Sequence, residues 1–148
     1  MIEVKIINDY SQKLEYLEKD ICSIINFILK NEEKTADSIS IILTNRLYLS
    51  KLKKKYFNVD QYTDVIAFNL EDEGELDIDG EIYISVDDVM DNAKIYSSEF
   101  NNEFCRVLIH GILHLAGYDD DIPDNIKIMR KLEEKYLLNF TKEIIKKC

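Results

Sequence analysis

The chain has 148 residues, of which 46% are hydrophobic, and its formal net charge is −10. This length and apolar content fit a single folded domain over residues 1–148 and exclude an intrinsically disordered chain. Residues 61–93 contain 11 acidic residues and no Lys or Arg, so the remainder of the chain is nearly neutral. A nucleic-acid partner is therefore not excluded by the net charge.

Signals for export or membrane insertion are missing from the sequence. No apolar run reaches the ~20 residues needed to span a bilayer, and residues 1–4 lack the basic-then-apolar layout of a signal peptide. The three cysteines (Cys22, Cys105 and Cys148) form no Cys-x-x-Cys pair and are odd in number, which favours free thiols. We therefore expect a cytoplasmic protein that has no membrane contact.

The first part of the chain alternates between strand and helix patterns. Residues 2–7 alternate and are β-branched, which predicts a strand, and helical apolar spacing predicts a helix over residues 11–30. Residues 39–43 predict a second strand, and Thr44 is the expected N-cap of the helix that follows. The expected apolar positions of that helix are Leu47, Leu52 and Tyr56.

The acidic middle of the chain contains two further strand patterns. Residues 65–68 predict a short apolar strand, an acidic loop over residues 71–81 includes a turn at Asp79-Gly80, and residues 81–85 predict the next strand. Ser85 and Asp88 resemble a capping box and are expected to begin a helix. The apolar positions of that helix are Val89, Ala93 and Tyr96.

The last third of the chain is predicted to be helical. Ser98 is the candidate cap of a long helix, Gly117 is the expected C′ residue at its end, and Pro123 suits the first turn of a final helix. Together the patterns predict an α+β fold with one mixed sheet of about four strands surrounded by about five or six helices. The buried stripe expected for the final helix comprises Ile126, Met129, Leu132, Tyr136, Leu137, Phe140 and Ile144.

The two histidines of the chain, His110 and His114, lie four residues apart in the apolar run of the predicted long helix. Side chains at this spacing share one helix face, with Cβ atoms about 5–6 Å apart. Gly117 lets the chain reverse direction, and residues 119–121 are all aspartates. Two imidazoles and one of these carboxylates can hold a divalent metal with one position open, so the residues predict a metal site whose third ligand is one of three aspartates.

The residue after the first histidine is Gly111, where a zinc protease of the His-Glu-x-x-His type has its general base. The glycine argues against peptidase chemistry of that type, and water activation would then depend on the metal. Glycine inside a helix costs about 0.5–1 kcal/mol relative to alanine. Either the close approach of a substrate or tight packing against another element would explain its presence.

The segment from His110 to Asp119 resembles the signature of the YbeY family, bacterial metal-dependent endoribonucleases of rRNA maturation. That signature reads His-Gly-x-Leu-His-Leu-x-Gly-Tyr and is followed closely by a third histidine. Residues 63–68 (Thr-Asp-Val-Ile-Ala-Phe) and 80–85 (Gly-Glu-Ile-Tyr-Ile-Ser) resemble two strands of the same family. Further similarities to the family's segments are found at Asn45, Tyr48, Met129 and Glu133.

The resemblance implies a zinc-dependent endoribonuclease that acts on single-stranded regions of precursor rRNA, with the ribosomal small subunit or assembly proteins as partners. The family's third histidine aligns with Asp120, so the implied ligands of one Zn²⁺ per chain are His110, His114 and Asp120. His114 would act in catalysis through the metal. A carboxylate is a competent zinc ligand and also suits harder divalent metals.

Besides Asp120, two positions depart from the family. Ala67 stands where the family pattern has a serine, and Leu49 stands where the family has an arginine that would stabilise phosphate charge. Nearby, the basic segment of residues 46–55 contains Arg46 and four lysines without an acid, which suits either a solvated helix end or an RNA-backbone contact. Arg46 is the candidate phosphate contact. The alternatives are a non-catalytic, metal-containing ribosome assembly factor, which Leu49 and Asp120 favour, and a metal-dependent hydrolase with another substrate.

Overall fold

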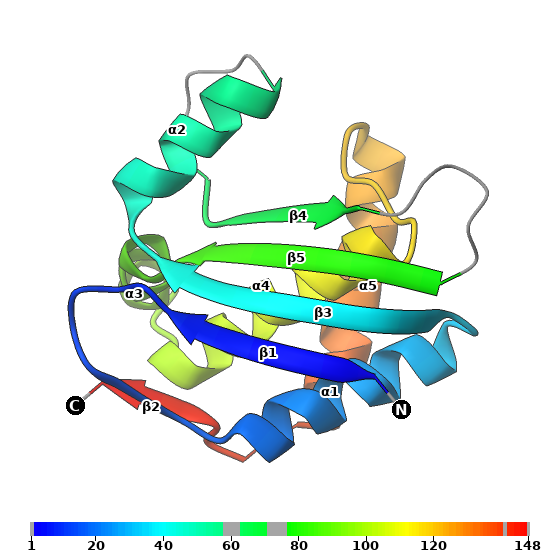
Figure 1. Cartoon of the computed structure of the whole chain (residues 1–148), viewed down its shortest axis with the longest axis horizontal. Coiled ribbons are helices and arrows are strands. Elements are labelled where there is room, and N and C mark those ends of the chain that lie inside the picture. The colour runs from blue at the N-terminus through cyan, green and yellow to red at the C-terminus, as the bar shows by residue number, and fades with distance from the viewer. Residues whose placement is uncertain (1, 58–62, 71–76, 141, 148) are drawn as a thin grey trace.

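Five helices and six strands make up the described part of the chain, residues 2–57, 63–70, 77–140 and 142–147 of a computed structural model (Figure 1). The strands form one mixed sheet of four strands and a separate sheet of two. This architecture confirms the predicted α+β class and the four-stranded mixed sheet, whereas the small second sheet was not predicted. Most of the predicted acidic loop, residues 71–76, lies outside the described residues, as does Cys148.

The main sheet has the strand order β1-β3-β5-β4. The first three strands run parallel, and β4 is an antiparallel edge strand beside β5. Each predicted strand is confirmed, although two of them extend further toward their N-terminal ends than the sequence suggested. The strands span Glu3–Asn8 (β1), Thr35–Thr44 (β3), Val65–Asn69 (β4) and Asp77–Ser85 (β5).

The predicted turn at Asp79-Gly80 is wrong, because both residues lie inside β5. Gly80 pairs with Ile39 of β3 on one side and with Asn69 of β4 on the other. A Cβ atom at position 80 would lie 2.6 Å from a methyl carbon of Leu115. The glycine therefore permits the close approach of a helix to the sheet, a tertiary requirement that resembles a turn signal in the sequence.

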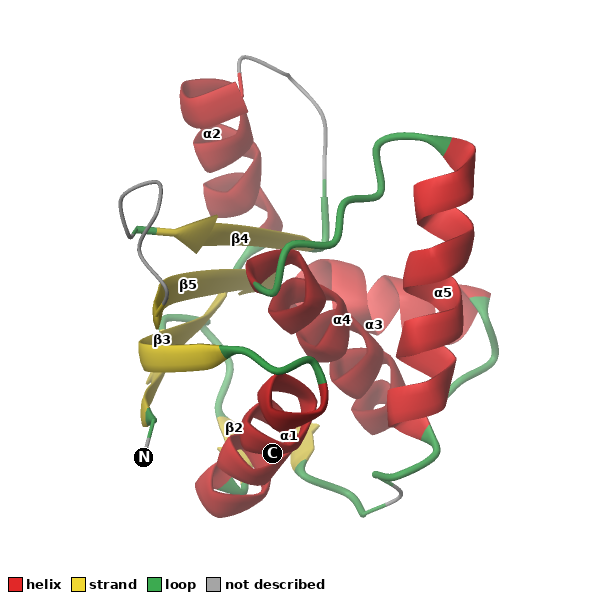
Figure 2. Ribbon diagram, turned by 90° about the vertical axis from the view of Figure 1, so that its right-hand side faces the viewer, coloured by secondary structure: helices red, strands yellow, loops and turns green. Residues whose placement is uncertain are grey.

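Four of the five helices in the described residues lie on the same side of the main sheet, and the fifth stands apart beyond β4 (Figure 2). We call the covered side the inner face. The helix that stands apart, α2, contacts β4, β5 and α3. The helices span Glu18–Asn31 (α1), Arg46–Phe57 (α2), Val86–Ile95 (α3), Phe100–Leu115 (α4) and Pro123–Leu137 (α5).

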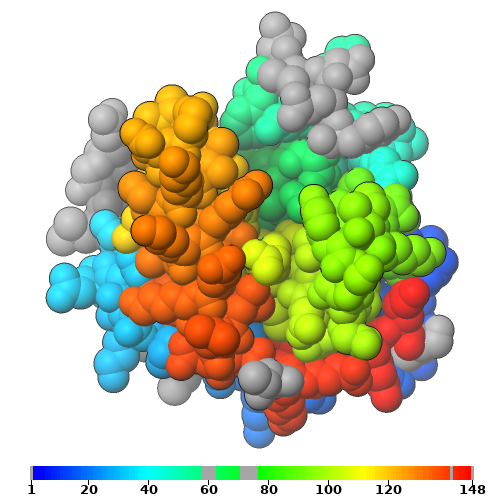
Figure 3. Space-filling model, turned by 180° about the vertical axis from the view of Figure 1, so that it is seen from behind, coloured from blue at the N-terminus to red at the C-terminus, as the bar shows by residue number. Residues whose placement is uncertain are grey.

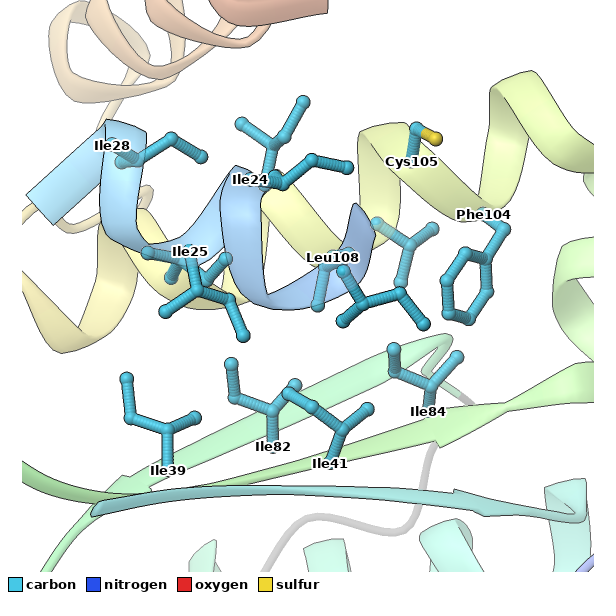
Figure 4. Packing of buried hydrophobic residues seen from close by; sticks show 14 of the residues in the cluster. Ile24, Ile25, Ile28, Ile39, Ile41, Ile82, Ile84, Phe104, Cys105 and Leu108 are labelled. Atoms are coloured by element: carbon cyan, nitrogen blue, oxygen red, sulfur yellow. The ribbon is translucent and has the colours of Figure 1, made fainter. Parts of the chain in front are cut away.

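The core lies between the inner face of the sheet and helices α1 and α4 (Figure 4). Alternate residues of β3 and β5 point into it, and isoleucines of α1 meet them from the opposite side. Full burial of one such side chain contributes about 1.5–3 kcal/mol. Helix α4 is thereby held on several sides. The core residues shown include Ile24, Ile25, Ile28, Ile39, Ile41, Ile82, Ile84, Phe104 and Leu108.

The predicted helix over residues 11–30 is wrong at its N-terminal end, because α1 begins only at Glu18. Residues Leu14–Tyr16 form strand β2 instead, which pairs antiparallel with β6, residues Ile145–Lys147. Buried Asn101 of α4 accepts hydrogen bonds from the backbone N–H groups of the residues that enter β6, at 2.7 and 3.2 Å. A pairing between the two ends of the chain thus overrides the local helical spacing.

The final helix is shorter than predicted, since it ends at Leu137 and leaves Phe140 and Ile144 outside it. Ile144 is nevertheless buried, because it leads into β6. The predicted position of Pro123 in the first turn is confirmed. Met129 and Tyr136 form the buried stripe together with a third residue, the carboxylate of Glu133.

Two predicted helix caps are wrong and one is confirmed. Thr44 ends β3, and the Asn45 side chain accepts a hydrogen bond from the Tyr48 backbone N–H at 2.8 Å at the start of α2. Glu99, rather than Ser98, precedes α4 and makes no capping hydrogen bond through its side chain. Ser85 caps α3 as predicted, accepting from the Asp88 backbone N–H.

Two general expectations about the chain can be compared with the described residues. Cys22 and Cys105 are free thiols, and burial raises the pKa of Cys105 to about 11, which keeps it protonated. None of the helices in these residues combines the length and apolarity required to cross a bilayer.

Candidate metal centre

Helix α4 presents His110 and His114 at the edge of the core, where each side chain is about one quarter exposed or less. Gly111, between the two histidines in the sequence, faces strands β4 and β5 of the sheet. A Cβ atom at position 111 would be 2.9 Å from the Cγ2 atom of Ile82 in β5. Tight packing of α4 on the sheet, rather than the approach of a substrate, therefore explains the glycine after the first histidine.

The C-terminus of α4 reverses the chain as predicted. Gly117 has φ +107°, a conformation that a residue with a side chain rarely adopts. Its backbone N–H donates to the His114 carbonyl at 3.0 Å, and the Tyr118 N–H donates to the Leu113 carbonyl at 3.0 Å. These two bonds form a Schellman motif, which directs the following residues back toward the histidines.

Three side chains converge after this turn. The Nε2 atoms of His110 and His114 are 2.9 Å apart, and the carboxylate oxygens of Asp120 lie 3.3 Å and 3.5 Å from them. A tetrahedral zinc ion with bonds of about 2.0–2.1 Å separates neighbouring ligand atoms by about 3.3 Å. The two Asp120 distances belong to different oxygens of its carboxylate, and one ligand atom from each of the three residues lies within 4.8 Å of the others. We call this group of three side chains the triangle, and its spacing suits three ligands of one metal ion.

The neighbouring aspartates differ from Asp120. Asp121 accepts a hydrogen bond from the Asn125 side chain at 2.8 Å, which ties it to the first turn of α5. Asp119 lines the same cleft but is not part of the converging group. Of the three candidates that the sequence left open, the structure brings Asp120 to both histidines.

Glu133 of α5 supports this triangle from behind, a role that the sequence analysis missed. The His110 Nδ1–H group donates to Glu133 Oε2 at 2.8 Å, which leaves the lone pair of Nε2 directed toward the metal position. Glu133 is only 6% exposed. The sequence does contain a sign of this role. Glu133 lies between Met129 and Tyr136 on an otherwise apolar stripe, and a buried charge there is unfavourable unless it has a partner.

The two histidines have opposite pKa shifts. Burial lowers the pKa of His110, but the hydrogen bond and charge of Glu133, together with Asp120 and Asp64, raise it above its usual value overall. Burial and the neighbouring charge of His110 lower the pKa of His114. Groups with strongly different environments, packed this closely, are typical of functional sites.

Several further carboxylates surround the site. Burial raises the pKa of Asp64 and of Glu103. Arg106 of α4 lies between two of the acids, 3.5 Å from Glu133 and 3.9 Å from Glu103. Among the described residues that line the cleft, five carboxylates face only Arg106 and Lys53, besides the histidines. This excess negative charge attracts a cation.

The site opens into a cleft of about 490 Å³. Lys53 and Phe57 of α2 line one side, residues 63–67 before and within β4 line the floor, and α4, α5 and the aspartate loop line the other side. A second hollow of about 680 Å³, over α3 and α5, shares Arg106 and His110 with it. Figure 3 shows the surface hollowed between the orange residues of α5 and the green residues of α3. The two hollows therefore adjoin at His110, beside the converging side chains.

Arg46, the predicted phosphate contact, is not brought into this cleft. Its guanidinium pairs with Asp88 at 3.0 Å and with Asp91, and its backbone N–H donates to Asp87 at 2.9 Å. Leu49, the position at which the resemblance implied a family arginine, is fully buried, and a charge there would be unfavourable. The cations that the structure does bring to the cleft are Lys53 and Arg106.

The fold and the site together define an α+β protein in which two histidines and a carboxylate, at the end of a core helix, could hold a metal ion. Residues 5–141 match the model of the family described as Endoribonuclease YbeY. The chain therefore belongs to the YbeY family.

Individual relatives support this assignment along most of the chain. The Endoribonuclease YbeY of Carboxydothermus hydrogenoformans is 34% identical over 137 residues, which cover 93% of this chain and 95% of that protein. The Endoribonuclease YbeY of Flavobacterium johnsoniae is 37% identical over 116 residues, covering 78% and 82%. The solution structure of a Thermotoga maritima protein has the same fold, with a TM-score of 0.61, 31% identity, and coverage of 93% of this chain and 87% of that one.

Proposed function

We propose that this protein is a zinc-dependent endoribonuclease that cuts single-stranded regions of precursor rRNA in small-subunit maturation and ribosome assembly or quality control. Its relatives carry the name endoribonuclease, which supports RNA as the substrate. The observation that carries the metal dependence is the triangle of His110, His114 and Asp120, in which one ligand atom from each residue lies within 4.8 Å of the others. We propose that residues 1–148 act as one cytoplasmic domain of this family.

Zinc bound by His110, His114 and Asp120 would polarise a phosphate oxygen and lower the pKa of water. Glu133 fixes the ring of His110 through the 2.8 Å hydrogen bond, and His114 contributes to catalysis as a ligand. The carboxylate of Asp120 makes the site less positive than three neutral imidazoles would. The same carboxylate makes the site able to accept harder divalent metals than zinc.

We propose that Arg106 and Lys53 contact the RNA phosphates. Both line the cleft, and the Arg106 side chain is 41% exposed despite its contacts with Glu103 and Glu133. Arg46 was the candidate suggested by the sequence, but its guanidinium is engaged by Asp88 and Asp91. Arg106 and Lys53 therefore take the role that the resemblance assigned to a family arginine.

The proposal is tested with His114→Ala, which removes one ligand of the triangle. We expect this variant to lose both stoichiometric zinc, measured by elemental analysis, and cleavage of a labelled single-stranded RNA. A second test is Asp120→Asn, and Asp119→Asn is its matched control, because Asp119 lines the cleft outside the converging group. Asp120→Asn should weaken zinc binding and Asp119→Asn should not. Full zinc content in His114→Ala would overturn the ligand assignment, and undiminished cleavage would overturn the metal dependence.

The second candidate is a non-catalytic, metal-containing ribosome assembly factor. Two observations favour it: a carboxylate completes the triangle, and buried Leu49 replaces the family arginine. A pure binding protein would show no difference in RNA cleavage between the wild type and His114→Ala, while both bound small-subunit particles. Cleavage by the wild type alone would exclude this second candidate.

A further inference from the structure

Helix α2 exposes aromatic rings and cations on the same short segment. Tyr48, Tyr56 and Phe57 are 46%, 58% and 48% exposed, although rings of this size are usually more buried. The helix also contains Arg46 and four lysines without an acidic residue. Figure 2 shows α2 beyond the edge strand β4, away from the helices of the inner face. These features are not needed for the metal centre itself.

Phe57 is fixed by another ring beneath it. Its ring stacks on that of Phe68 in β4, with centroids 5.9 Å apart and planes inclined by 15°. Phe68 is held in turn by the edge contacts of Tyr56 at 5.2 Å and of Tyr83 at 5.9 Å. Phe57 therefore presents a flat ring whose orientation is set by its neighbours and whose surface is about half exposed.

A cation accompanies this ring at the mouth of the metal cleft. The Lys53 Nζ atom lies 5.0 Å from the Phe57 ring centroid, as expected one helical turn earlier. Lys53 and Phe57 are the two α2 residues that line the cleft containing His110, His114 and Asp120. The ring and the ammonium group are therefore continuous with the proposed cleavage site.

A fixed exposed ring beside a cation has the properties needed to bind single-stranded RNA. Bases stack on aromatic side chains regardless of sequence, and lysines neutralise the phosphates between them. The bases of a double helix already stack on one another, so they cannot lie on such a ring. The Lys53 ammonium group lies over the ring, so a base that stacks on Phe57 takes the place of this group, which is then free to contact the adjacent phosphate.

We propose that Phe57 is a stacking platform for one base of single-stranded RNA and that Lys53 contacts the adjacent phosphate. This inference rests on the proposed function, because the stacked base belongs to the RNA that enters the metal cleft. It goes further in identifying what selects a single strand: a base must be unstacked from its neighbours to reach Phe57. We expect removal of the ring to weaken binding roughly 5- to 100-fold.

The stacking contact can be observed directly because the chain contains no tryptophan. Phe57→Trp introduces a single tryptophan at the platform, which can be excited apart from the tyrosines. Stacking of a base should quench its emission when a 2′-O-methyl single-stranded oligonucleotide is added to the zinc-loaded protein. Phe27→Trp is the matched control, since Phe27 on α1 is 38% exposed, packs edge-on against other rings and lies outside the cleft. We expect no quenching in the control. An abasic oligonucleotide of equal length should bind without quenching.

Affinity measurements separate the ring from the charge. Phe57→Leu should weaken binding of the normal oligonucleotide but not of the abasic one, and Phe57→Tyr should restore it. Lys53→Ala should weaken binding of both and reduce the salt dependence by about one phosphate contact. Thermal unfolding of each variant checks that the fold is retained. Equal quenching in Phe57→Trp and Phe27→Trp, or unchanged binding by Phe57→Leu, would overturn the inference.

Failure of this inference can be distinguished from failure of the proposed function. If Phe57→Leu binds and cleaves RNA like the wild type while His114→Ala does not cleave, the endoribonuclease stands and the platform is wrong. If neither the wild type nor any variant cleaves RNA, but Phe57→Leu still loses affinity only for the normal oligonucleotide, then the stacking platform is supported and the proposed cleavage activity is wrong.

Discussion

Helices α4 and α2 carry the two halves of the proposed site and differ sharply in burial. In α4, 11 of the 16 residues are buried, whereas Leu49 is the one buried residue among the 12 of α2. Metal ligands require positions held to fractions of an ångström, which close packing provides. Contacts to a flexible polymer require exposed rings and cations instead. The difference shows how one cleft combines a rigid chemical centre with an accessible binding wall.

Helices α2 and α4 are held against the rest of the protein by different kinds of interaction. The core of apolar residues encloses α4, and Gly111 lets it approach β5 closely. Helix α2 is held by Leu49, by ring contacts such as that between Tyr48 and Tyr83, and by pairing of Arg46 with α3. Substitutions in the two helices should therefore have effects of different size and kind.

The largest difference is expected between Leu108→Ala in α4 and Leu47→Ala in α2. Leu108 is fully buried, and its truncation should reduce the free energy of unfolding by about 2–5 kcal/mol. Leu47 is 62% exposed, and its truncation should change that free energy by less than about 0.5 kcal/mol. Urea unfolding followed by circular dichroism measures both values. Similar losses in the two variants would break the comparison.

Glu133→Gln tests whether the buried carboxylate of α5 positions His110 as a metal ligand. Loss of the charge that orients His110 should weaken zinc affinity about 10- to 100-fold, measured by competition with a chelator. The matched control is Glu134→Gln, which removes the same charge from the next, exposed residue of α5. If both variants bound zinc equally well, Glu133 would not act through His110.

Gly111→Ala measures how tightly α4 packs on the sheet. Crowding against Ile82 is expected to cost about 1–3 kcal/mol, and the better helix propensity of alanine offsets at most about 1 kcal/mol. We therefore expect a net destabilisation of about 1 kcal/mol in urea unfolding. In an Ile82→Ala background, where space is available, the same substitution should become neutral or stabilising. Equal effects in both backgrounds would contradict the packing explanation.

The smallest effect is expected for Arg46→Ala. Its partly exposed pairs with Asp88 and Asp91 should contribute about 0–1 kcal/mol to stability. Cleavage of single-stranded RNA should be unchanged, whereas Arg106→Ala should reduce it, because Arg106 lines the cleft and Arg46 does not. A strong cleavage defect in Arg46→Ala, with normal stability, would restore Arg46 as the phosphate contact.

The parts of the site that depend on local geometry could be predicted from the sequence. His110 and His114 share a helix face because of their spacing, and Gly117 ends the helix because its φ is positive. These two features together direct one of the following aspartates toward the histidines. Local geometry does not decide which of the three aspartates joins the histidines. The family resemblance indicated Asp120, and in the structure Asp121 accepts a hydrogen bond from Asn125 instead.

Features that join distant parts of the chain were decided only by the tertiary structure. Glu133 forms a hydrogen bond with His110, 23 residues away in the sequence, and Arg46 forms ion pairs with the acids of α3. Leu14 is a strand residue because its pairing partner lies at the other end of the chain. Local spacing determined the four strands of the main sheet, the core helices and the histidine pair, since it acts within one or two turns of chain. The charge partners and the walls of the cleft depended on which surfaces the folded core brought together, a long-range effect that local patterns do not contain.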